Sequence, residues 1–215
     1  PHVLAMGQRT RARVLTYGMA ETADVRATDF RAAWPERFSL TVNFQGESVR
    51  IETGLFGDLL ATSLLAAVAG AVALGIPLRQ CAASLQGIES FSSRLSIHRG
   101  PRGSWMIKDT YKAPFWGVSR VFALMKDAVA ARKTIVLGTM SDTGGTDSRR
   151  YRAMAREALT LADRVICIGP KSTYIRKMLT PELEDRLLVI ESVRSACRFL
   201  ADTCLENELV LLKSN

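Results

Sequence analysis

The chain has little histidine and little cysteine for its 215 residues, and this scarcity argues against several kinds of site. Histidine occurs only at His2 and His98, so a histidine-based metal centre or a Ser-His-Asp triad is disfavoured. The four cysteines lie in apolar stretches and form no C-x-x-C pair. They are typical of buried, reduced thiols, so we expect a cytoplasmic protein without a metal site of its own.

Lysine is absent from the first 107 residues, and this absence bears on nucleotide binding. The first lysine is Lys108, and no G-x-x-x-x-G-K-[ST] phosphate loop occurs in the chain. No G-x-G-x-x-G follows a predicted strand either, which disfavours a dinucleotide cofactor. The first half of the chain therefore cannot supply a phosphate-loop lysine.

Long hydrophobic runs are also scarce, and one stretch alone approaches the length of a membrane span. Residues 59–76 contain no charged side chain over 18 positions, the lower limit for a transmembrane helix. Six of them are alanine and two are glycine, and polar Thr62 and Ser63 interrupt the run. No aromatic belt or basic flank frames it. We expect a buried helix packed through small side chains, and no membrane partner.

Positive charge is concentrated in one half of the chain. Residues 1–91 hold eight Arg and eight Asp or Glu, whereas residues 92–215 hold 21 Lys or Arg and 13 Asp or Glu, which accounts for the net charge of +8. Such asymmetry indicates two units with different roles. No basic run exceeds three residues. A nucleic-acid partner is therefore disfavoured, and a phosphorylated or carboxylated small molecule fits the diffuse positive charge.

Residues 1–91 show the pattern of a small β-rich region followed by helices. The alternation over residues 38–44, a Gln45-Gly46-Glu47 turn and the return over residues 48–53 predict a β-hairpin. The other predicted elements are a strand at 14–17 and helices at 27–34, 59–74 and 78–86.

From residue 92 on, short apolar strands alternate with amphipathic helices. Strands are predicted at 94–98, 105–109, 134–138, 164–169, 187–191 and 208–213, and helices at about 115–131, 148–162, 172–185 and 192–205. This alternation favours an α/β fold with a Rossmann-like, mostly parallel six-stranded sheet covered by helices on both faces. A polar stretch at residues 90–93 places the boundary near residue 91, which gives domains 1–91 and 92–215.

The loops that follow several predicted strands are polar, basic or rich in glycine. Ligands of parallel sheets bind outside the carboxyl ends of the strands. The loops concerned are residues 109–114, 138–145, 169–171 and 213–214. We therefore expect these loops to converge on one ligand-binding edge.

Six pieces of sequence stand in a particular order along the chain. They are the alanine-rich stretch 54–67, Ser93-Arg94, Lys108-Asp-Thr-Tyr-Lys-Ala-Pro114, Gly138-Thr-Met-Ser-Asp-Thr-Gly144, Val165-Ile-Cys-Ile-Gly169 and Leu209-Val-Leu-Leu-Lys-Ser214. In their order and spacing they resemble the carboxyl half of a Mur ligase. The most similar type is the one that adds D-alanyl-D-alanine to UDP-MurNAc-tripeptide (MurF). The resemblance covers nearly the whole chain.

The resemblance implies a three-domain enzyme of which this chain holds the carboxyl part. Residues 1–91 would end the central, ATP-binding α/β domain, and residues 92–215 would form the third domain. ATP would phosphorylate a substrate carboxylate, and an amino-acid or dipeptide amine would attack the acyl phosphate, as in cell-wall peptide synthesis. The phosphate loop, most Mg²⁺ ligands and a UDP-sugar domain would lie upstream or in a partner chain, so this chain alone would be inactive.

Two positions, Arg94 and Asp109, carry over best from the resemblance, and Lys213 also has a counterpart. Arg94 matches an arginine that reaches the ATP phosphates, where a guanidinium stabilises anionic oxygens and would act catalytically. Asp109 matches a nucleotide-binding carboxylate that contacts the ribose and orients the arginine. Lys213 matches a lysine that faces the cleft.

At other positions the chain departs from the pattern of the family. Lys108 replaces the first Asp of a D-D pair, and the loop at residues 111–114 is one residue shorter than its counterpart. The loop at residues 138–144 is also altered. The candidates for substrate binding are Lys108, Tyr111, Lys112, Met140 and Asp142 from these altered segments, together with the matching Lys213.

Other departures leave alternative functions open. Phe56 and Ser63 stand where the family has His and Asn near adenine, and Tyr151 stands where it has a later His. One alternative is a non-catalytic Mur-ligase module that binds a nucleotide, a peptide or a partner protein. Another is a related ligase with a different amino-acid substrate, such as a polyglutamate-type enzyme. A nucleic-acid-binding module is a more remote alternative, whose signature would be a steep salt dependence.

Overall fold

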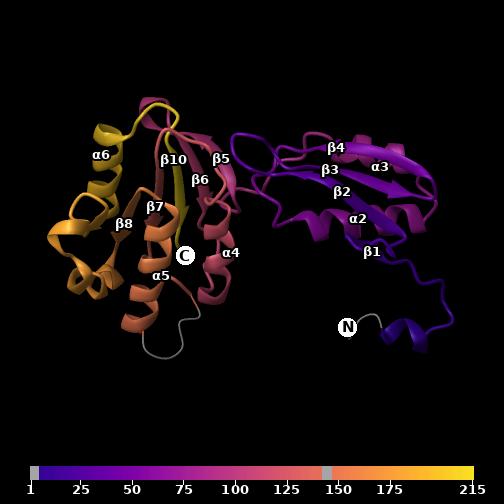
Figure 1. Cartoon of the computed structure of the whole chain (residues 1–215), viewed down its shortest axis with the longest axis horizontal. Coiled ribbons are helices and arrows are strands. Elements are labelled where there is room, and N and C mark those ends of the chain that lie inside the picture. The colour runs from indigo at the N-terminus through magenta and orange to yellow at the C-terminus, as the bar shows by residue number, and fades with distance from the viewer. Residues whose placement is uncertain (1–4, 142–146) are drawn as a thin grey trace. The chain divides into compact units, whose positions relative to one another are not determined.

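The computed structural model of the chain describes residues 5–141 and 147–215, and the chain divides into two compact units (Figure 1). The main division falls between Ile88 and Glu89, close to the predicted boundary. Two short segments of the first half, Ala33–Arg37 and Leu55–Gly57, belong to the second unit. The second unit is therefore not a single continuous stretch of sequence.

The sheet of the first unit has four strands in the order β1-β2-β3-β4. Their bounds are β1 Tyr17–Gly18, β2 Val25–Arg31, β3 Ser39–Phe44 and β4 Glu47–Glu52. β1 and β2 are parallel, whereas β2–β3 and β3–β4 are antiparallel. Between β3 and β4, Gln45 and Gly46 have φ values of 50° and 82°, the left-handed conformation of a tight hairpin turn. The predicted hairpin is confirmed.

The helix predicted over residues 27–34 is wrong, because most of this segment lies in strand β2. Val25 and Ala27 are buried and alternate with the half-buried Arg26 and Thr28, so the segment follows a period of two residues. Pairing with β3 overrides the helix propensity of its alanine and arginine residues. The strand predicted at residues 14–17 starts only at Tyr17.

Two helices, α2 Ala61–Ala73 and α3 Leu78–Leu85, pack against this sheet. The buried positions of α2 recur every three or four residues, as in a helix that covers a core with one face. They are Ala61, Leu64, Leu65, Val68 and Ala69. Among the described residues, no helix is both long enough and apolar enough to cross a bilayer. The uncharged run thus contains a packed helix, as predicted, but the helix has 13 residues and is shorter than the predicted 59–74.

The sheet of the second unit has six strands in the order β5-β6-β10-β7-β8-β9. Their bounds are β5 Ser96–Arg99, β6 Trp105–Asp109, β7 Lys133–Leu137, β8 Arg164–Ile168, β9 Leu187–Ile190 and β10 Leu209–Lys213. β5 is antiparallel to β6, and all other neighbours are parallel. The predicted Rossmann-like, mostly parallel α/β sheet is confirmed.

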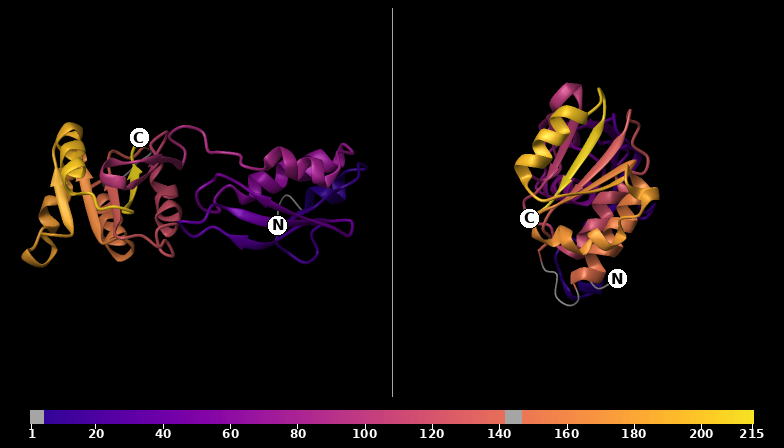
Figure 2. Two further views of the ribbon diagram at one scale, coloured as in Figure 1. Left: turned by 90° about the horizontal axis from the view of Figure 1, so that it is seen from above. Right: turned by 90° about the vertical axis from the view of Figure 1, so that its left-hand side faces the viewer.

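Helices cover both faces of this sheet (Figure 2). α4 Val118–Ala123 and α5 Asp147–Leu161 link strands that step in one direction, and α6 Val193–Thr203 links β9 back to β10. Right-handed crossovers therefore place α6 on the face opposite to α4 and α5. Leu200 of α6 belongs to a buried cluster with Val136, Ile166 and Val210 of the sheet.

Two predicted helices differ from the observed elements. The segment predicted as a helix at 115–131 contains a 3₁₀ turn, η3 Phe115–Gly117, and the short helix α4. Farther along it, the N–H of Val129 donates to the carbonyl of Trp34 instead of to its own helix. The segment predicted at 172–185 forms the 3₁₀ turns η4 Pro170–Tyr174, η5 Arg176–Met178 and η6 Pro181–Leu183. Pro181 has no N–H and cannot continue a helix from the preceding turn.

Candidate functional site

The carboxyl ends of β6 and β10 bring an aspartate and a lysine together. Parallel pairing sets Lys213 opposite Asp109 on one side and Leu137 on the other. Lys213 Nζ lies 2.6 Å from Asp109 Oδ2, and the two side chains are 4% and 12% exposed. Two predicted site residues, 104 positions apart in the sequence, therefore form a buried, charge-assisted hydrogen bond at the expected edge.

The backbone on either side of Arg94 adopts a conformation that is rare for residues with a side chain. Ser93 and Leu95 have φ values of 64° and 54°. The carbonyl of Ser93 accepts the N–H groups of Thr110 (2.9 Å) and Tyr111 (3.1 Å), which ties this turn to the loop after β6. Such strain persists only where the surrounding structure holds it in place.

Arg94 and Tyr111 meet at this corner of the site. The guanidinium carbon of Arg94 lies 4.4 Å from the centroid of the Tyr111 ring, a cation–π contact, and both residues are exposed. The ion pair of Asp109 is made with Lys213, whereas Arg94 rests on Tyr111. The implied pairing of Asp109 with Arg94 is therefore not the arrangement in this structure.

The loops after β6 and β7 are fastened to each other. The N–H of Ser141 donates to the carbonyl of Ala113 at 2.9 Å, and the N–H of Phe115 donates to the carbonyl of Ser141 at 3.3 Å. Next to them, the N–H of Met140 donates to the hydroxyl of the buried Tyr151 on α5 at 2.8 Å. Burial raises the pKa of this hydroxyl above its ordinary value, so Tyr151 stays neutral at physiological pH.

Gly138 allows a close approach between two of the site loops. A Cβ atom at this position would overlap the hydroxyl of Ser214, the residue after β10. The N–H of Gly138 donates to the carbonyl of Lys213 at 2.9 Å, which sets the end of β7 against the end of β10. Glycine is thus required here by space.

The remaining predicted residues are spread over these loops. Lys108 is half-buried on β6, and because strand side chains alternate, it points to the face of the sheet opposite to Asp109. Lys112 is exposed and has a φ of 95°. The side chain of Met140 is buried in the protein, and its N–H donates to the Tyr151 hydroxyl. The Met140 side chain is therefore not directed to a ligand. Asp142 lies outside the described residues.

Lys171 and Tyr151 take a larger part in the site than the sequence indicated. Lys171 Nζ lies 2.6 Å from Asp147 Oδ2 and joins the loop after β8 to the start of α5. The hydrogen bond that Lys171 donates to the Asp147 carboxylate raises the pKa of Lys171. The sequence signals were the position of Lys171 at a strand end and the replacement of a family histidine by Tyr151.

A protein-built metal cage is not present among the described residues, because no group of three or more His, Cys, Asp or Glu side chains lies together there. Within that part of the chain, the acids nearest the site are already paired, Asp109 with Lys213 and Asp147 with Lys171. Any Mg²⁺ at this edge would need ligands from a nucleotide or from residues outside those described.

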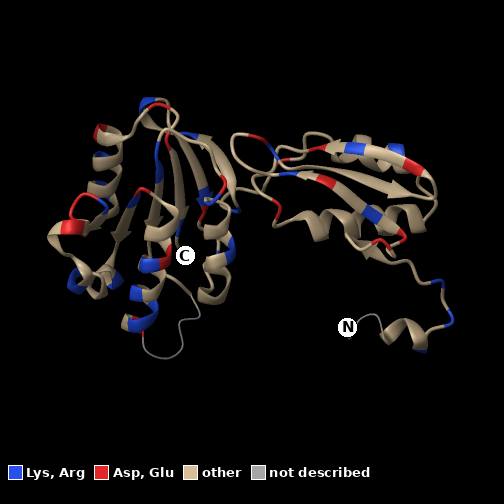
Figure 3. Cartoon of the chain, in the orientation of Figure 1, with Lys and Arg blue, Asp and Glu red and all other residues tan. Residues whose placement is uncertain are grey.

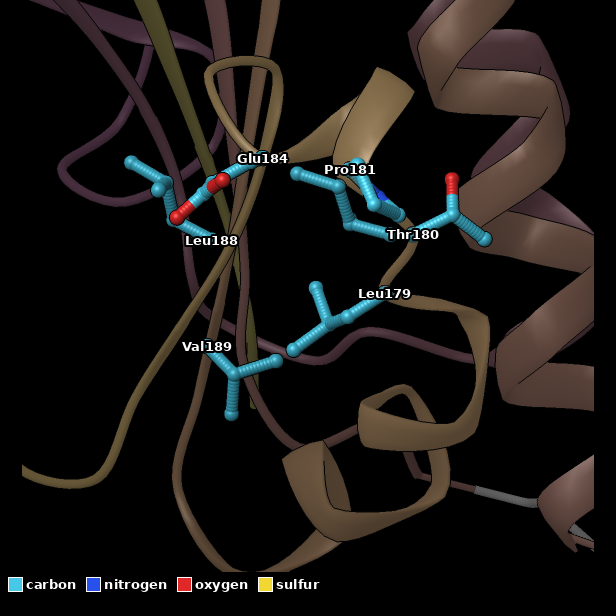
Figure 4. Close-up of a pocket in the computed structure, with 7 residues that line it drawn as sticks. Leu179, Thr180, Pro181, Glu184, Leu188 and Val189 are labelled. Atoms are coloured by element: carbon cyan, nitrogen blue, oxygen red, sulfur yellow. The ribbon is translucent and has the colours of Figure 1, made fainter.

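A cavity lies beside the carboxyl ends of β7 and β10, on the face of the sheet that α6 covers. It has a volume of about 490 Å³, and Thr110, Gly138, Lys213 and Ser214 line it. A smaller hollow of about 350 Å³ lies beside the edge strand β9 (Figure 4). It is lined by Leu179, Thr180, Pro181, Glu184, Leu187, Leu188 and Val189. No cation lines that hollow, so we do not include it in the candidate site.

Comparison with known sequences places these observations in a family. A family model described as "Mur ligase, glutamate ligase domain" matches residues 93–215. The chain is 23% identical over 215 residues to the UDP-N-acetylmuramoyl-L-alanyl-D-glutamate–2,6-diaminopimelate ligase of Listeria monocytogenes, covering 96% of this chain and 43% of the relative. It is 25% identical over 199 residues to the UDP-N-acetylmuramyl-tripeptide synthetase of Roseiflexus, covering 90% and 36%. The chain spans less than half the length of these curated relatives.

Solved structures share the fold at low sequence identity. The MurF ligase of Thermotoga maritima in complex with ADP matches with a TM-score of 0.76 at 16% identity, covering 100% of this chain and 48% of that one. The folylpolyglutamate synthase of the same organism matches with a TM-score of 0.67 at 16% identity, covering 99% and 48%. Because the family model matches more than half of the chain and the fold agrees, this chain belongs to the Mur ligase family.

Proposed function

We propose that this chain is the carboxyl part of an ATP-dependent ligase that joins a carboxylate and an amine as an amide. The observation that carries the proposal is the buried Asp109–Lys213 pair at the carboxyl edge of a parallel sheet, with Arg94 on an adjoining strained turn. The sequence relatives are named as ligases and synthetases of UDP-N-acetylmuramoyl peptides, and one structural neighbour holds ADP. Further domains or a partner chain would complete the site.

The proposed reaction has two steps and needs no covalent protein nucleophile. A carboxylate oxygen of the acid attacks the γ-phosphorus of ATP, the bond to ADP breaks, and an acyl phosphate forms. The amine then attacks the acyl carbon, phosphate leaves, and the nitrogen gives up a proton. Both steps gather negative charge on phosphoryl oxygens, so positioned cations and a fixed substrate geometry lower the barrier.

The residues of this chain would contribute binding and charge. The exposed guanidinium of Arg94 would leave the Tyr111 ring and bind phosphate oxygens in a fork geometry. Asp109 would contact the ribose while Lys213 holds Oδ2 and fixes the carboxylate. ATP supplies the phosphoryl group, and Mg²⁺ would balance its charge.

We further propose that the acid is a carboxylate-bearing cell-wall peptide and that the amine is a dipeptide such as D-alanyl-D-alanine. The support is the order of the motifs together with the likeness in fold to MurF structures. Lys108, Tyr111 and Lys112 lie on or next to the loop after β6, where a substrate would approach. A single amino acid is the alternative amine, because the sequence relatives are named for 2,6-diaminopimelate.

One observation favours a second candidate, a non-catalytic module that binds a nucleotide, a peptide or a partner protein. The carboxylate of Asp109 is 12% exposed and already paired with Lys213, so little of it faces an incoming ligand. Such a module would bind ATP or a peptide without releasing phosphate.

The assay that tests the ligase uses the complete protein with ATP, Mg²⁺, a cell-wall peptide acid and candidate amines. We expect phosphate release that depends on both acid and amine. Arg94→Ala should lower turnover at least ~100-fold, the effect of removing one positioned charge stabiliser. Arg198→Ala, an exposed arginine of α6, is the matched control. Unchanged turnover in Arg94→Ala would remove this residue from the mechanism, and nucleotide binding without phosphate release would favour the non-catalytic module.

The role of Asp109 is tested by comparing how its substitution changes the affinities for ATP and for the amine. Asp109→Asn keeps the shape of the side chain and should weaken ATP binding more than amine binding, because the carboxylate is assigned to the ribose. Calorimetric titration of the complete protein with each ligand measures the two affinities. A larger loss for the amine would place Asp109 on the substrate side.

A further inference from the structure

A groove of about 600 Å³ lies between α5 and the 3₁₀ turns that precede β9. From α5 it is lined by Arg152, Arg156 and Leu159. The opposite wall consists of Lys177, Met178 and Leu183. Three cations and three apolar side chains thus share one concave surface.

The three cations of this groove make no stabilising polar contact with the described residues. Within the described part of the chain, no hydrogen bond or ion pair reaches Arg152, Arg156 or Lys177. The neighbouring Arg176, by contrast, pairs with Glu191 at 2.7 Å. The groove therefore holds positive charge that the protein itself does not neutralise.

The two acids of α5 have other partners than the cations of the groove. Asp147 pairs with Lys171, and Glu157 accepts a hydrogen bond from the Ser119 hydroxyl at 2.8 Å. Arg152 and Arg156 are four residues apart, so they are like charges on one face of the helix, which is an unfavourable arrangement. A bound anion would relieve this repulsion.

The groove is separate from the candidate ligase site. α5 starts next to the carboxyl edge of the sheet, at Asp147, which is tied to the loop after β8. At ~1.5 Å per residue, Arg152 and Arg156 lie about 8 and 14 Å farther along the helix. Figure 3 shows basic residues along α5 beyond its start.

We propose that this groove binds a phosphate ester whose organic part is apolar. Paired guanidinium groups fit phosphate oxygens in a fork geometry, and the lysine adds a point charge from the opposite wall. The apolar half of the lining, Leu159, Met178 and Leu183, would contact the organic part and give no advantage to inorganic phosphate. The volume suits a small molecule. The proposal is independent of ligase activity.

The first test is an NMR titration of the whole 215-residue chain with phenyl phosphate, inorganic phosphate and benzyl alcohol. We expect phenyl phosphate to bind at least ~5-fold more tightly than either of the others, because it alone has both the charge and the apolar ring. Shifts should gather at residues 152–159 and 177–183 and persist with saturating ATP. Binding confined to the loops after β6 and β10, or displaced by ATP, would overturn the proposal.

A pair of matched double variants makes the test specific. Arg152→Ala/Arg156→Ala should weaken phenyl phosphate at least 10-fold with an unchanged melting temperature. Arg194→Ala/Arg198→Ala removes two exposed arginines at the same spacing on α6 and should have no effect. Equal losses in both would mean general charge attraction and would overturn the groove as a site, as would the absence of binding to the parent chain.

Binding to lipid vesicles distinguishes a lipid headgroup from a soluble compound as the source of the phosphate ester. Binding to phosphatidylglycerol vesicles, but not phosphatidylcholine vesicles, that is lost in Arg152→Ala/Arg156→Ala would identify a lipid headgroup. Binding of soluble phenyl phosphate alone would identify a soluble ester. Both results support the phosphate-ester groove.

Discussion

Asp109 and Lys213 compensate each other's charge inside the protein. Both side chains are nearly buried, and their bond at 2.6 Å is a charge-assisted contact. Breaking such a pair by removing one partner leaves an uncompensated buried charge, at a cost of about 3–5 kcal/mol. We therefore expect Lys213→Met to lower the free energy of unfolding by that amount in urea denaturation.

The double variant separates the burial of charge from the loss of packing. Asp109→Asn/Lys213→Met carries no charge at either position, so it should be more stable than Lys213→Met by about 1–3 kcal/mol. If the two single losses simply add in the double variant, the pair does not act as a unit. Any effect of these substitutions on substrate binding would then need a cause other than the loss of the Asp109–Lys213 pair.

Strands β7, β8 and β10 are joined at their amino ends by the buried Glu208. Its carboxylate accepts hydrogen bonds from Arg132, Thr134 and Arg164, and from the N–H of Leu205. Burial would raise the pKa of Glu208, but the hydrogen bonds from Arg132, Thr134 and Leu205 outweigh it, so the pKa lies below the usual 4.5. The network lies at the end of the sheet opposite to the candidate site.

The sign of this shift predicts acid sensitivity. A carboxyl group with a depressed folded pKa stabilises the fold above its unfolded pKa, and the stabilisation is lost as the pH falls through the folded pKa. We expect unfolding free energy to fall below about pH 4.5 in the parent chain. Glu208→Gln should lose about 3–5 kcal/mol at pH 7, because Arg164 stays buried without its counter-charge, and should show a flatter acid limb. Urea titrations of both proteins from pH 3 to 7 test this prediction. Parallel plots of unfolding free energy against pH for the parent chain and Glu208→Gln would contradict it.

Sequence patterns located the strands of the second unit well, because each is a short apolar run bounded by polar or glycine-rich loops. They also placed Asp109 and Lys213 at strand ends. They did not reveal that the two meet, because β10 inserts between β6 and β7 and no local pattern encodes that order. The same limit applies to β2, whose pairing with β3 outweighs its own helix propensity.

The second unit as a whole includes side chains from the first half of the sequence. Trp34 is 4% exposed, and its ring lies 5.3 Å from that of Trp105 on β6 and 6.1 Å from that of Phe56. The guanidinium of Arg37 lies 4.9 Å from the Trp34 ring. Residues 33–37 and 55–57 therefore complete a core that residues 89–215 alone would leave open.

Because short segments of the first half complete its core, we expect the second unit to lose stability when it is expressed without them. Residues 89–215 expressed alone should be less stable than the same unit in the whole chain by roughly 3 kcal/mol or more, since buried Trp34 and Phe56 each contribute about 1.5–3 kcal/mol. In the whole chain, Trp34→Ala should cost about 3–5 kcal/mol, whereas Trp116→Ala, at an exposed position, should stay within about 0.5 kcal/mol. Urea unfolding followed by tryptophan fluorescence and circular dichroism measures all four proteins. A fragment as stable as the parent unit would show that the short segments are dispensable and that the unit folds from residue 89 onward by itself.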